Sequence, residues 1–249
     1  MRILTLNCQK AYQPTFEDFL IRILKEEKYN FILLQEVNST VRLIIDKVDS
    51  SYKILDSFDA ELGEKSHVYV LYKNDYIFKN ALFISFANLD SKFTRRGWGF
   101  VGGLFAKNNK NIFVGSVHLH PGFRSRKRLK QVKIIKQKIL EKNKDVHTII
   151  GGDFNTGLPF EIYNQEKVFS PELVRITNNL APTLDSRYTE KTPFFITKVA
   201  NFLASIGISI KFRADHIYIS KPLEKYSICK MLPDRVSDHN PVELSTEFA

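Results

Sequence analysis

Cysteine is scarce in this chain of 249 residues, which contains only Cys8 and Cys229. Two thiols cannot form the dense disulfide framework of a small secreted domain, and reduced thiols in an intracellular protein are the simpler interpretation. A single structural disulfide is the alternative. Neither cysteine has a partner at the spacing of a zinc site, so the sequence disfavours a thiolate-bound zinc ion.

Long hydrophobic runs are also missing. No apolar stretch reaches the roughly 18 residues that a membrane-spanning helix needs. The N-terminus has no basic segment followed by an apolar core and a cleavage site, because Met1 leads almost directly into the apolar residues 3–6. We therefore expect a soluble, cytoplasmic protein with no stable membrane insertion.

Acidic residues are the minority among the charged ones, with 27 Asp and Glu against 37 Lys and Arg and a net charge of +10. Such an excess attracts polyanions over long range, which makes nucleic acid or an anionic membrane surface a plausible partner. Hydrophobic residues make up 43% of the chain. This composition and length suit a single α/β domain over residues 1–249.

Short apolar runs rich in β-branched and aromatic residues predict the strands, and each run stops at a polar cluster. They occupy residues 3–6, 31–34, 68–72, 100–105, 112–117, 147–150 and 216–219. Helical spacing appears in Phe16, Phe19, Leu20, Ile23 and Leu24, with Thr15 expected as the N-cap and Asp18 three residues later.

The same helical spacing returns in Leu129, Val132, Ile135, Ile139 and Leu140, so residues 125–142 should form a second amphipathic helix. Strands in pairs with helices between them favour two packed sheets flanked by helices. The least regular stretch, residues 155–212, contains four prolines and is interpreted as a long functional insertion with one or two short helices.

Polar side chains recur at the strand ends, which is the most informative feature of the sequence. Asn7 follows the first run, Glu36 the second, His118 the run at 112–117, and Asp153 and Asn155 the run at 148–150; Asp215 opens the run at 217–219, and Asp238, His239 and Asn240 precede residues 241–244. If these ends converge, they form a concave site rich in hard oxygen ligands. Such a site suits Mg²⁺ or Mn²⁺.

These residues could perform phosphoester hydrolysis together. A metal held by Glu36 could neutralise a phosphate oxygen, and Asp153 could orient a water for attack. His239 and His118 could hydrogen-bond a phosphate oxygen as imidazolium, or His239 held by Asp215 could accept a proton as neutral imidazole. Taken singly, each residue also has an ordinary explanation as a turn former, a helix cap or a solvated loop residue.

Six blocks resemble, in order, the motifs of the endonuclease/exonuclease/phosphatase superfamily, which includes deoxyribonuclease I, exonuclease III and neutral sphingomyelinases. The blocks are Leu4-Thr5-Leu6-Asn7, Leu34-Gln35-Glu36-Val37, Ser116-Val117-His118-Leu119, Gly151-Gly152-Asp153-Phe154-Asn155, Arg213-Ala214-Asp215-His216-Ile217 and Ser237-Asp238-His239-Asn240-Pro241. They span nearly the whole chain. The resemblance implies one catalytic domain, folded as a four-layer α/β/β/α sandwich with two packed, mainly antiparallel sheets.

The resemblance also implies a role for each matching residue. Asn7 and Glu36 would bind Mg²⁺ or Mn²⁺, with Glu36 as the main ligand, and Asp238 would be a further ligand of the metal or of its water. Asp153 would position the attacking water, Asn155 and His118 would contact the phosphate, and Asp215 would orient His239. Arg96, ahead of the strand at 101–105, and Arg128, on the helix after His118, are subsidiary matches expected to help bind the substrate.

The substrate stays open among three hypotheses. A nuclease or nucleotide phosphodiesterase is favoured by the positive charge, a phospholipid or inositol-phosphate phosphodiesterase is the alternative, and a non-catalytic binding domain is the remote one. The segment from His118 to Gly122 departs from the tyrosine and asparagine of abasic-site endonucleases, which argues against that repair activity. The basic residues at 124–136 could bind a polyanionic backbone or form a solvated helix face.

Overall fold

A computed structural model gives the fold of most of the chain. It describes residues 1–8, 13–57, 67–86, 99–121, 125–140, 143, 145–156, 159–176, 184–185, 211–212, 214–234 and 236–247. Within these ranges the strands form two six-stranded sheets and a separate two-stranded one, which joins β10 (Leu184–Asp185) and β11 (Lys211–Phe212).

The first sheet has the strand order β13-β14-β1-β2-β4-β3. Its strands are β1 (Arg2–Asn7), β2 (Phe31–Val37), β3 (Tyr52–Asp56), β4 (His67–Lys73), β13 (Ser227–Met231) and β14 (Val242–Thr246). β1 and β2 run parallel, and the other neighbours are antiparallel.

The second sheet has the strand order β5-β6-β7-β8-β12-β9. Its strands are β5 (Ile77–Ser85), β6 (Gly99–Lys107), β7 (Lys110–His118), β8 (His147–Asp153), β9 (Leu173–Ile176) and β12 (Asp215–Ser220). Here β7 and β8 are the parallel pair. Each sheet is therefore mainly antiparallel around one parallel pair, as predicted.

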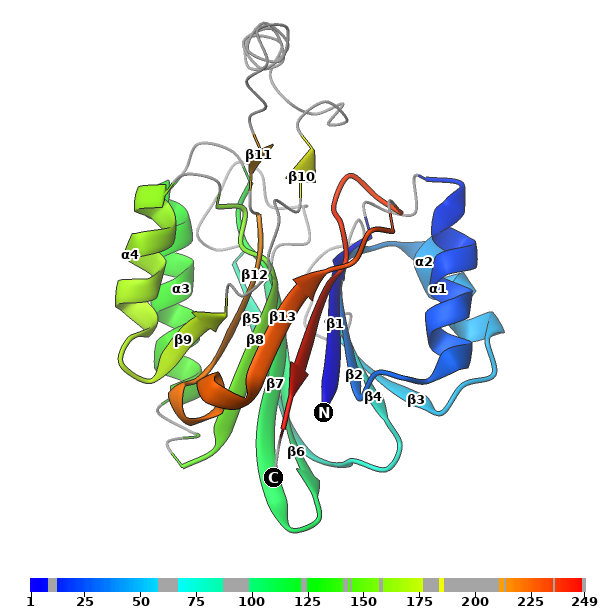
Figure 1. The fold of residues 1–249 in the computed structure, drawn as a ribbon, viewed down its shortest axis with the longest axis horizontal. Coiled ribbons are helices and arrows are strands. Elements are labelled where there is room, and N and C mark those ends of the chain that lie inside the picture. The colour runs from blue at the N-terminus through cyan, green and yellow to red at the C-terminus, as the bar shows by residue number, and fades with distance from the viewer. Residues whose placement is uncertain are drawn as a thin grey trace, which may run out of the picture.

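Helices cover the outer faces of both sheets (Figure 1). α1 (Thr15–Glu26) and α2 (Ser39–Lys47) lie on the first sheet, and α3 (Ser125–Leu140) and α4 (Pro159–Phe169) lie on the second. A 3₁₀ helix, η5 (Lys221–Tyr226), joins β12 to β13. The predicted four-layer α/β/β/α sandwich is confirmed. Among the helices described, none is both long and apolar enough to cross a membrane.

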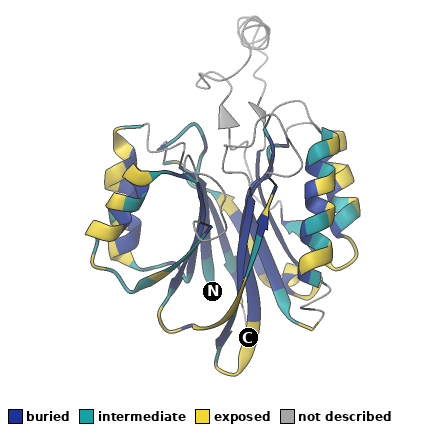
Figure 2. Cartoon of the chain, turned by 180° about the vertical axis from the view of Figure 1, so that it is seen from behind, coloured by how far each residue is buried: buried dark blue, intermediate teal, exposed yellow. Residues whose placement is uncertain are grey.

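Three layers of buried side chains hold the sandwich together. The central layer lies between the sheets and includes Leu33, Val70, Val114 and Ile149, all fully buried. Two outer layers lie between each sheet and its helices. In Figure 2 the strands are largely buried, whereas the helices expose their outer surfaces. Burial of these apolar surfaces is the main stabilising term, at about 25 cal/mol per Å².

The predicted elements are present, with corrections at their ends. All seven predicted strands lie inside observed strands, and the first helix buries its predicted face from Phe16 to Leu24. Thr15 is not the N-cap, since it is the first residue of α1 and Pro14 occupies the cap without a side-chain hydrogen bond. The described part of the second predicted helix ends at Leu140. The predicted insertion contains α4 and β9, and most of its remainder lies outside the described residues.

Gly152 is the residue of β8 at which the backbone demands glycine. Its φ is +147°, and a Cβ added there would lie 2.1 Å from the carbonyl oxygen of Val117 on the neighbouring strand β7. A side chain rarely adopts this φ, and the clash is with backbone that cannot move aside. This close approach brings β7 and β8 together one residue before Asp153.

We expect Gly152→Ala to lower the free energy of unfolding by at least about 3 kcal/mol, because the cost of the strained φ and the cost of the clash with the Val117 backbone add together. Urea denaturation followed by circular dichroism measures it. Gly151→Ala is the matched control: its Cβ would meet the end of the Leu33 side chain at 2.8 Å, which can shift, so its loss should be smaller. Equal losses for the two variants would contradict the assignment.

Candidate active site

The first sheet brings Asn7 and Glu36 to one edge. β1 and β2 are parallel and Asn7 pairs with Gln35, so both strands end at the same place. The register of β2 against β4 shifts between Leu34 and Val37, and Glu36 has a φ of +52°. A bulge of this kind turns a side chain away from the regular alternation. The strained backbone at Glu36 therefore marks a residue whose direction is set by the fold.

The second sheet places three predicted residues in one row. His118 at the end of β7 pairs with Asp153 at the end of the parallel strand β8. Asp153 in turn pairs with Asp215, the first residue of the antiparallel strand β12. All three side chains are buried, with 3% or less of each residue's surface exposed. The row arises from the strand register alone.

The loop before β14 adds Asp238 and His239 to the same edge. β14 is antiparallel to β1 and pairs Val242 with Thr5, so the residues that precede it lie beside the end of β1. Ser237 fixes this loop: its hydroxyl donates to the Asn7 carbonyl oxygen at 2.8 Å and accepts from the His239 amide at 2.9 Å. Ser237 was not among the predicted site residues.

The groups meet around one carboxylate oxygen, Oδ2 of Asp153. The Asn7 amide donates to it at 2.9 Å, and Nε2 of His118 and of His239 lie 3.6 and 3.9 Å from it. Oε1 of Glu36 lies 3.8 Å from the same His118 nitrogen. Residues from both sheets and from the loop before β14 therefore form one cluster.

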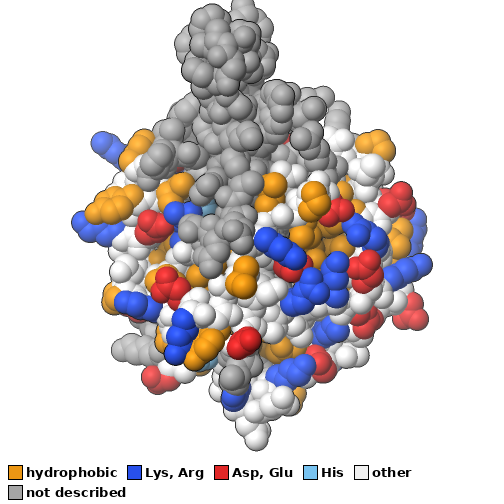
Figure 3. Space-filling model, viewed as in Figure 1, with side chains coloured by type: hydrophobic (Ala, Val, Ile, Leu, Met, Phe, Trp, Pro, Cys, Tyr) orange, Lys and Arg blue, Asp and Glu red, His pale blue; other side chains and the backbone are white. Residues whose placement is uncertain are grey.

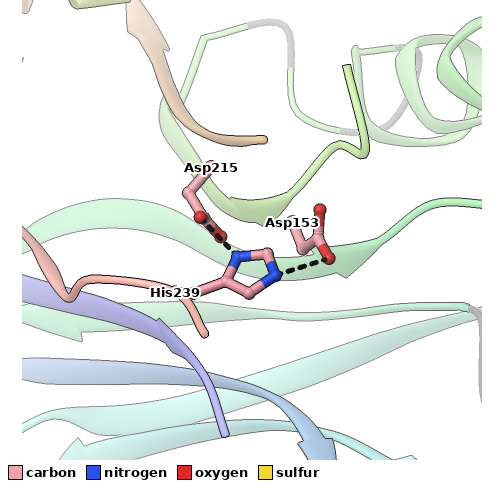
Figure 4. Close-up of side chains that lie close together, drawn as sticks. All are labelled: Asp153, Asp215 and His239. Carbon is pink, nitrogen blue, oxygen red and sulfur yellow. Dashed lines mark hydrogen bonds and ion pairs between the residues drawn. The ribbon is translucent and has the colours of Figure 1, made fainter. Parts of the chain in front are cut away.

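His239 lies between two carboxylates (Figure 4). Its Nδ1 is 2.7 Å from Oδ2 of Asp215, and its Nε2 points toward Asp153. Oδ1 of Asp238 lies 3.8 Å from the same Nε2. An imidazole held at Nδ1 by a buried carboxylate keeps a fixed ring orientation and presents Nε2 to the site.

Burial and neighbouring charges have opposite effects on the pKa values of His239 and Asp153. Burial acts to lower the pKa of His239, but Asp215 and Asp153 outweigh it and hold that pKa well above its ordinary value. Burial raises the pKa of Asp153 to about 6, although His239 and His118 act to lower it. An imidazolium next to a carboxylate with a pKa near neutrality is an acid–base arrangement typical of active sites.

Asn155 holds Asp153 in place. Its φ is +50°, its backbone amide donates to Oδ1 of Asp153 at 2.8 Å, and its Nδ2 donates to the carbonyl oxygen of Leu119 at 2.9 Å. The residue thus joins the loops after β7 and β8. Its contact with a phosphate stays a prediction.

The two predicted substrate-binding arginines have different outcomes. Arg96 lies outside the described residues. Arg128 is 2% exposed, and its guanidinium donates to Oε1 of Glu161 at 2.6 Å and to the carbonyl oxygen of His120 at 3.1 Å. These bonds point inward and tie α3 to α4 and to the loop after His118. Arg128 therefore stabilises the loop after His118 from the interior of the protein.

We expect Arg128→Met to lower the free energy of unfolding by about 3–5 kcal/mol, because it leaves the Glu161 carboxylate buried without its partner. Thermal and urea unfolding measure it, and Arg128→Met/Glu161→Leu should recover most of the loss. The control is Arg22→Met, whose partner Asp234 forms an exposed pair and whose loss should stay below about 1 kcal/mol. A loss as small as that of the control would refute the structural role.

A polar network beneath the site was also not predicted. Nε2 of Gln35 donates to the hydroxyl of Ser116 across the two sheets at 2.8 Å and to that of Thr5 at 3.2 Å. All three residues are buried. The available signal was their position, since each is a polar residue within an otherwise apolar strand, one or two residues before a site residue.

The donor atoms suit a hard cation. Asp153, Asp215 and His239 each offer an atom within 4.8 Å of the others, so this buried group could bind a metal ion. Glu36 and Asp238 add two more carboxylates, and their side chains are 19% and 14% exposed against 2% for Asp153 and Asp215. Four carboxylates in so small a space repel one another unless protons or cations compensate, and carboxylate and amide oxygens are the ligands that Mg²⁺ prefers.

This fold and this cluster define a phosphoester hydrolase, and comparison with known proteins gives its family. The model of the Endonuclease/Exonuclease/phosphatase family matches residues 4–239, so the chain belongs to that family. The resemblance inferred from the six blocks is confirmed. No curated protein matches the chain.

Solved structures share the fold at low sequence identity. The structure of D. rerio TDP2 with a single-strand DNA product is 15% identical, with a TM-score of 0.75 over 98% of this chain and 97% of the other. TDP2 from C. elegans is 18% identical, with a TM-score of 0.72 over 98% and 74%. The mannosyl-6-phosphatase of Bacteroides thetaiotaomicron is 14% identical, with a TM-score of 0.69 over the full length of both chains.

Proposed function

We propose that the chain is a Mg²⁺- or Mn²⁺-dependent phosphodiesterase that acts on nucleic acid or nucleotides. The proposed hydrolysis rests on one observation, which is that three polar side chains surround Oδ2 of Asp153. The Asn7 amide lies 2.9 Å from this oxygen, and Nε2 of His118 and of His239 lie 3.6 and 3.9 Å from it. The net charge of +10 favours a polyanionic substrate. D. rerio TDP2, which shares the fold, was solved with a single-strand DNA product.

Glu36 is the proposed main metal ligand. Asn7 is proposed to bind the metal with it, and Asp238 to bind the metal or its water. Glu36 and Asp238 are the more solvent-accessible carboxylates of the cluster, whereas Asp215 is engaged with His239 at 2.7 Å. A divalent cation bound there would neutralise negative charge on a phosphate oxygen and on the leaving group. This assignment leaves the Asp215–His239 hydrogen bond intact.

The protein side chains supply the proton transfers and the orientation. Above a pH of about 6 the Asp153 carboxylate is ionised and can accept a proton from the attacking water. The Asn7 side-chain amide and the Asn155 backbone amide both donate to this carboxylate and hold it in place. They thereby help to position the water. His239, protonated and oriented by Asp215, hydrogen-bonds a phosphate oxygen through Nε2. His118 contacts the phosphate from the end of β7, and buildup of negative charge strengthens both contacts.

Asp215→Asn should move the alkaline limb of the pH–rate profile to lower pH. Asp215 is the largest factor that raises the pKa of His239 against burial, so its neutralisation lets that pKa fall, and the active imidazolium loses its proton earlier. The profile of kcat/KM against pH on a small aryl diester measures the shift. An alkaline limb that stays in place, or that moves upward, would contradict the imidazolium role and favour the neutral base.

A substrate panel tests the proposed function. Bis(p-nitrophenyl) phosphate, single-stranded DNA, RNA, sphingomyelin, an inositol phosphate and mannose 6-phosphate are incubated with the chain in Mg²⁺ and in excess chelator. We expect chelator-sensitive cleavage of the aryl diester and salt-sensitive cleavage of nucleic acid. Equal turnover in chelator refutes the metal requirement. A salt-independent preference for the lipid or for the sugar phosphate refutes the nucleic-acid assignment.

We also propose that the protein works in the cytoplasm. Support comes from the two thiols, Cys8 and Cys229, which are both free and both buried. Fractionation of cells that express a tagged full-length protein tests this location. Recovery from an oxidising compartment or from the medium would contradict it.

A further inference from the structure

Helices α3 and α4 start at the edge where the active site lies. α3 follows the strand that ends at His118, and α4 follows the strand that ends at Asp153. Because β7 and β8 are parallel neighbours, both helices begin at that edge and run side by side down the outer face of the second sheet (Figure 1). The first turns of both helices therefore lie at the edge of the second sheet that carries His118 and Asp153.

Most of the charge on these two helices is positive. α3 has the sequence SRKRLKQVKIIKQKIL, with seven basic residues and no acidic one. The acids of α4 have cationic partners: Glu161 pairs with Arg128 at 2.6 Å and Glu166 with Arg175 at 2.7 Å. Glu172, just after α4, pairs with Lys136.

Three basic residues of α3 keep their charge available at the surface. Arg126, Lys130 and Lys133 are exposed and lie at intervals of four and three residues, so they occupy one face of the helix. This spacing forms a row of cations that starts at the end of α3 nearest the site. A row of this kind can follow the phosphates of a nucleic-acid strand.

Two exposed aromatic residues lie on the neighbouring helix. Phe160 is 55% exposed and Tyr163 is 63% exposed, and they are one turn apart near the start of α4. Figure 3 shows hydrophobic and basic side chains next to one another on the flank of the molecule where α3 and α4 lie. Exposed aromatic rings beside cations are the two features that single-strand binding surfaces combine, since bases stack on the rings.

A groove joins the two features. A cavity of about 220 Å³ lies between the first halves of the helices, lined by Ser125, Arg126, Arg128 and Leu129 on α3 and by Glu161, Asn164 and Gln165 on α4. Helical spacing places Phe160 beside Asn164 at the rim, on the side away from the cationic row. The α3 side of the groove thus carries Arg126 of the cationic row, and Phe160 lies next to the α4 side.

We propose that this α3–α4 surface binds a single-stranded segment of the nucleic-acid substrate next to the phosphate that is cleaved. Phosphates lie along Arg126, Lys130 and Lys133, and unpaired bases stack on Phe160 and Tyr163. This inference rests on the proposed function and specifies its substrate as single-stranded. A row of cations on one helix and exposed rings on its neighbour, with a groove between the helices, suits a strand that offers phosphates on one side and bases on the other.

Binding of fluorescein-labelled oligothymidylate to the full-length chain in chelator tests the proposal, because no turnover occurs and binding is separated from catalysis. The Kd is measured by anisotropy over a series of salt concentrations. One variant is Phe160→Ala/Tyr163→Ala and another is Arg126→Gln/Lys130→Gln/Lys133→Gln. The matched control, Tyr226→Ala/Ile228→Ala, removes two exposed hydrophobic side chains near β13, of which Tyr226 is 46% and Ile228 57% exposed.

We expect the aromatic variant to raise the Kd at least about tenfold with little change in the salt dependence, since stacking on each ring contributes about 1–3 kcal/mol. The cationic variant should reduce the slope of log K against log salt by about 2, because each phosphate that a cation neutralises on a single strand contributes about 0.7 to that slope. The control should bind as the wild type does.

Other outcomes would overturn the proposal. These are wild-type Kd values for both variants, tighter binding of duplex than of single strand, or a loss of binding to phosphatidylserine vesicles with unchanged oligonucleotide binding. Failure of the proposed function is seen separately, as absence of chelator-sensitive diester hydrolysis by the wild type. Hydrolysis with unchanged binding in the variants would reject only the α3–α4 surface.

Discussion

His239→Asn is expected to lower kcat on an aryl phosphodiester by about 10³-fold, within the range found for a lost general acid–base or charge-stabilising group. The imidazole lies between Asp215 and Asp153, with Nδ1 held at 2.7 Å and Nε2 directed to the site. Asparagine cannot carry a positive charge, so the phosphate oxygen loses its charged hydrogen-bond donor. The Asp215 carboxylate also loses its partner.

The readout for this prediction is steady-state kinetics in saturating Mg²⁺, with circular dichroism to confirm folding. His147→Gln provides the matched control, because His147 opens β8 at the end of the strand remote from Asp153. Its activity should remain near wild type. A His239→Asn enzyme with more than a tenth of the wild-type rate would remove His239 from the proposed mechanism.

Glu36→Gln is expected to have the second largest effect, seen in the metal dependence. The side chain is directed by a bulge in β2 with a φ of +52°, and its Oε1 lies 3.8 Å from Nε2 of His118. Loss of the negative charge of a main ligand should raise the Mg²⁺ concentration for half-maximal rate by at least about 10²-fold. Mutation of a residue that only hydrogen-bonds a metal ligand has a smaller effect, roughly 10–100-fold.

Titration of activity with Mg²⁺ and of Mg²⁺ binding by calorimetry both measure this effect. The calorimetric readout is independent of turnover. Glu26→Gln, at the surface end of α1, is the control and should titrate as the wild type does. An unchanged Mg²⁺ affinity in Glu36→Gln would assign the metal to other carboxylates.

The position of the site could be predicted because it follows from local sequence and simple topology. Asn7, Glu36, His118 and Asp153 each end an apolar run, and parallel neighbouring strands end at the same edge. The antiparallel pairing of β12 with β8 then brings in Asp215. Apolar periodicity locates such strands well, which is why the two-sheet fold was also predictable.

What could not be predicted depends on interactions between distant segments. Ser237 acts through the Asn7 carbonyl oxygen, 230 residues away in sequence, and Gln35 through Ser116 on the other sheet. The family resemblance implied that Arg128 helps to bind the substrate; the structure shows its guanidinium buried and paired with Glu161 on α4, and a contact with the substrate stays a prediction. No local pattern gives the partner of such a side chain.

Some elements escaped prediction because their burial is low or their apolar pattern is short. α2 buries only Val41, Ile44 and Ile45. The edge strand β5 exposes most of its residues, including Ile77 and Phe78, so it lacks the regular alternation of a half-covered strand. The bulge at Glu36 likewise has no signature in the sequence around it, since neither glycine nor proline marks it.

The most direct test is anomalous diffraction from crystals of the full-length chain grown with Mn²⁺. A peak within coordination distance of the Glu36 carboxylate, with the 2.7 Å hydrogen bond between His239 and Asp215 preserved, is the predicted result. A peak seated among Asp153, Asp215 and His239 with that hydrogen bond broken, or no peak near either group, would contradict it.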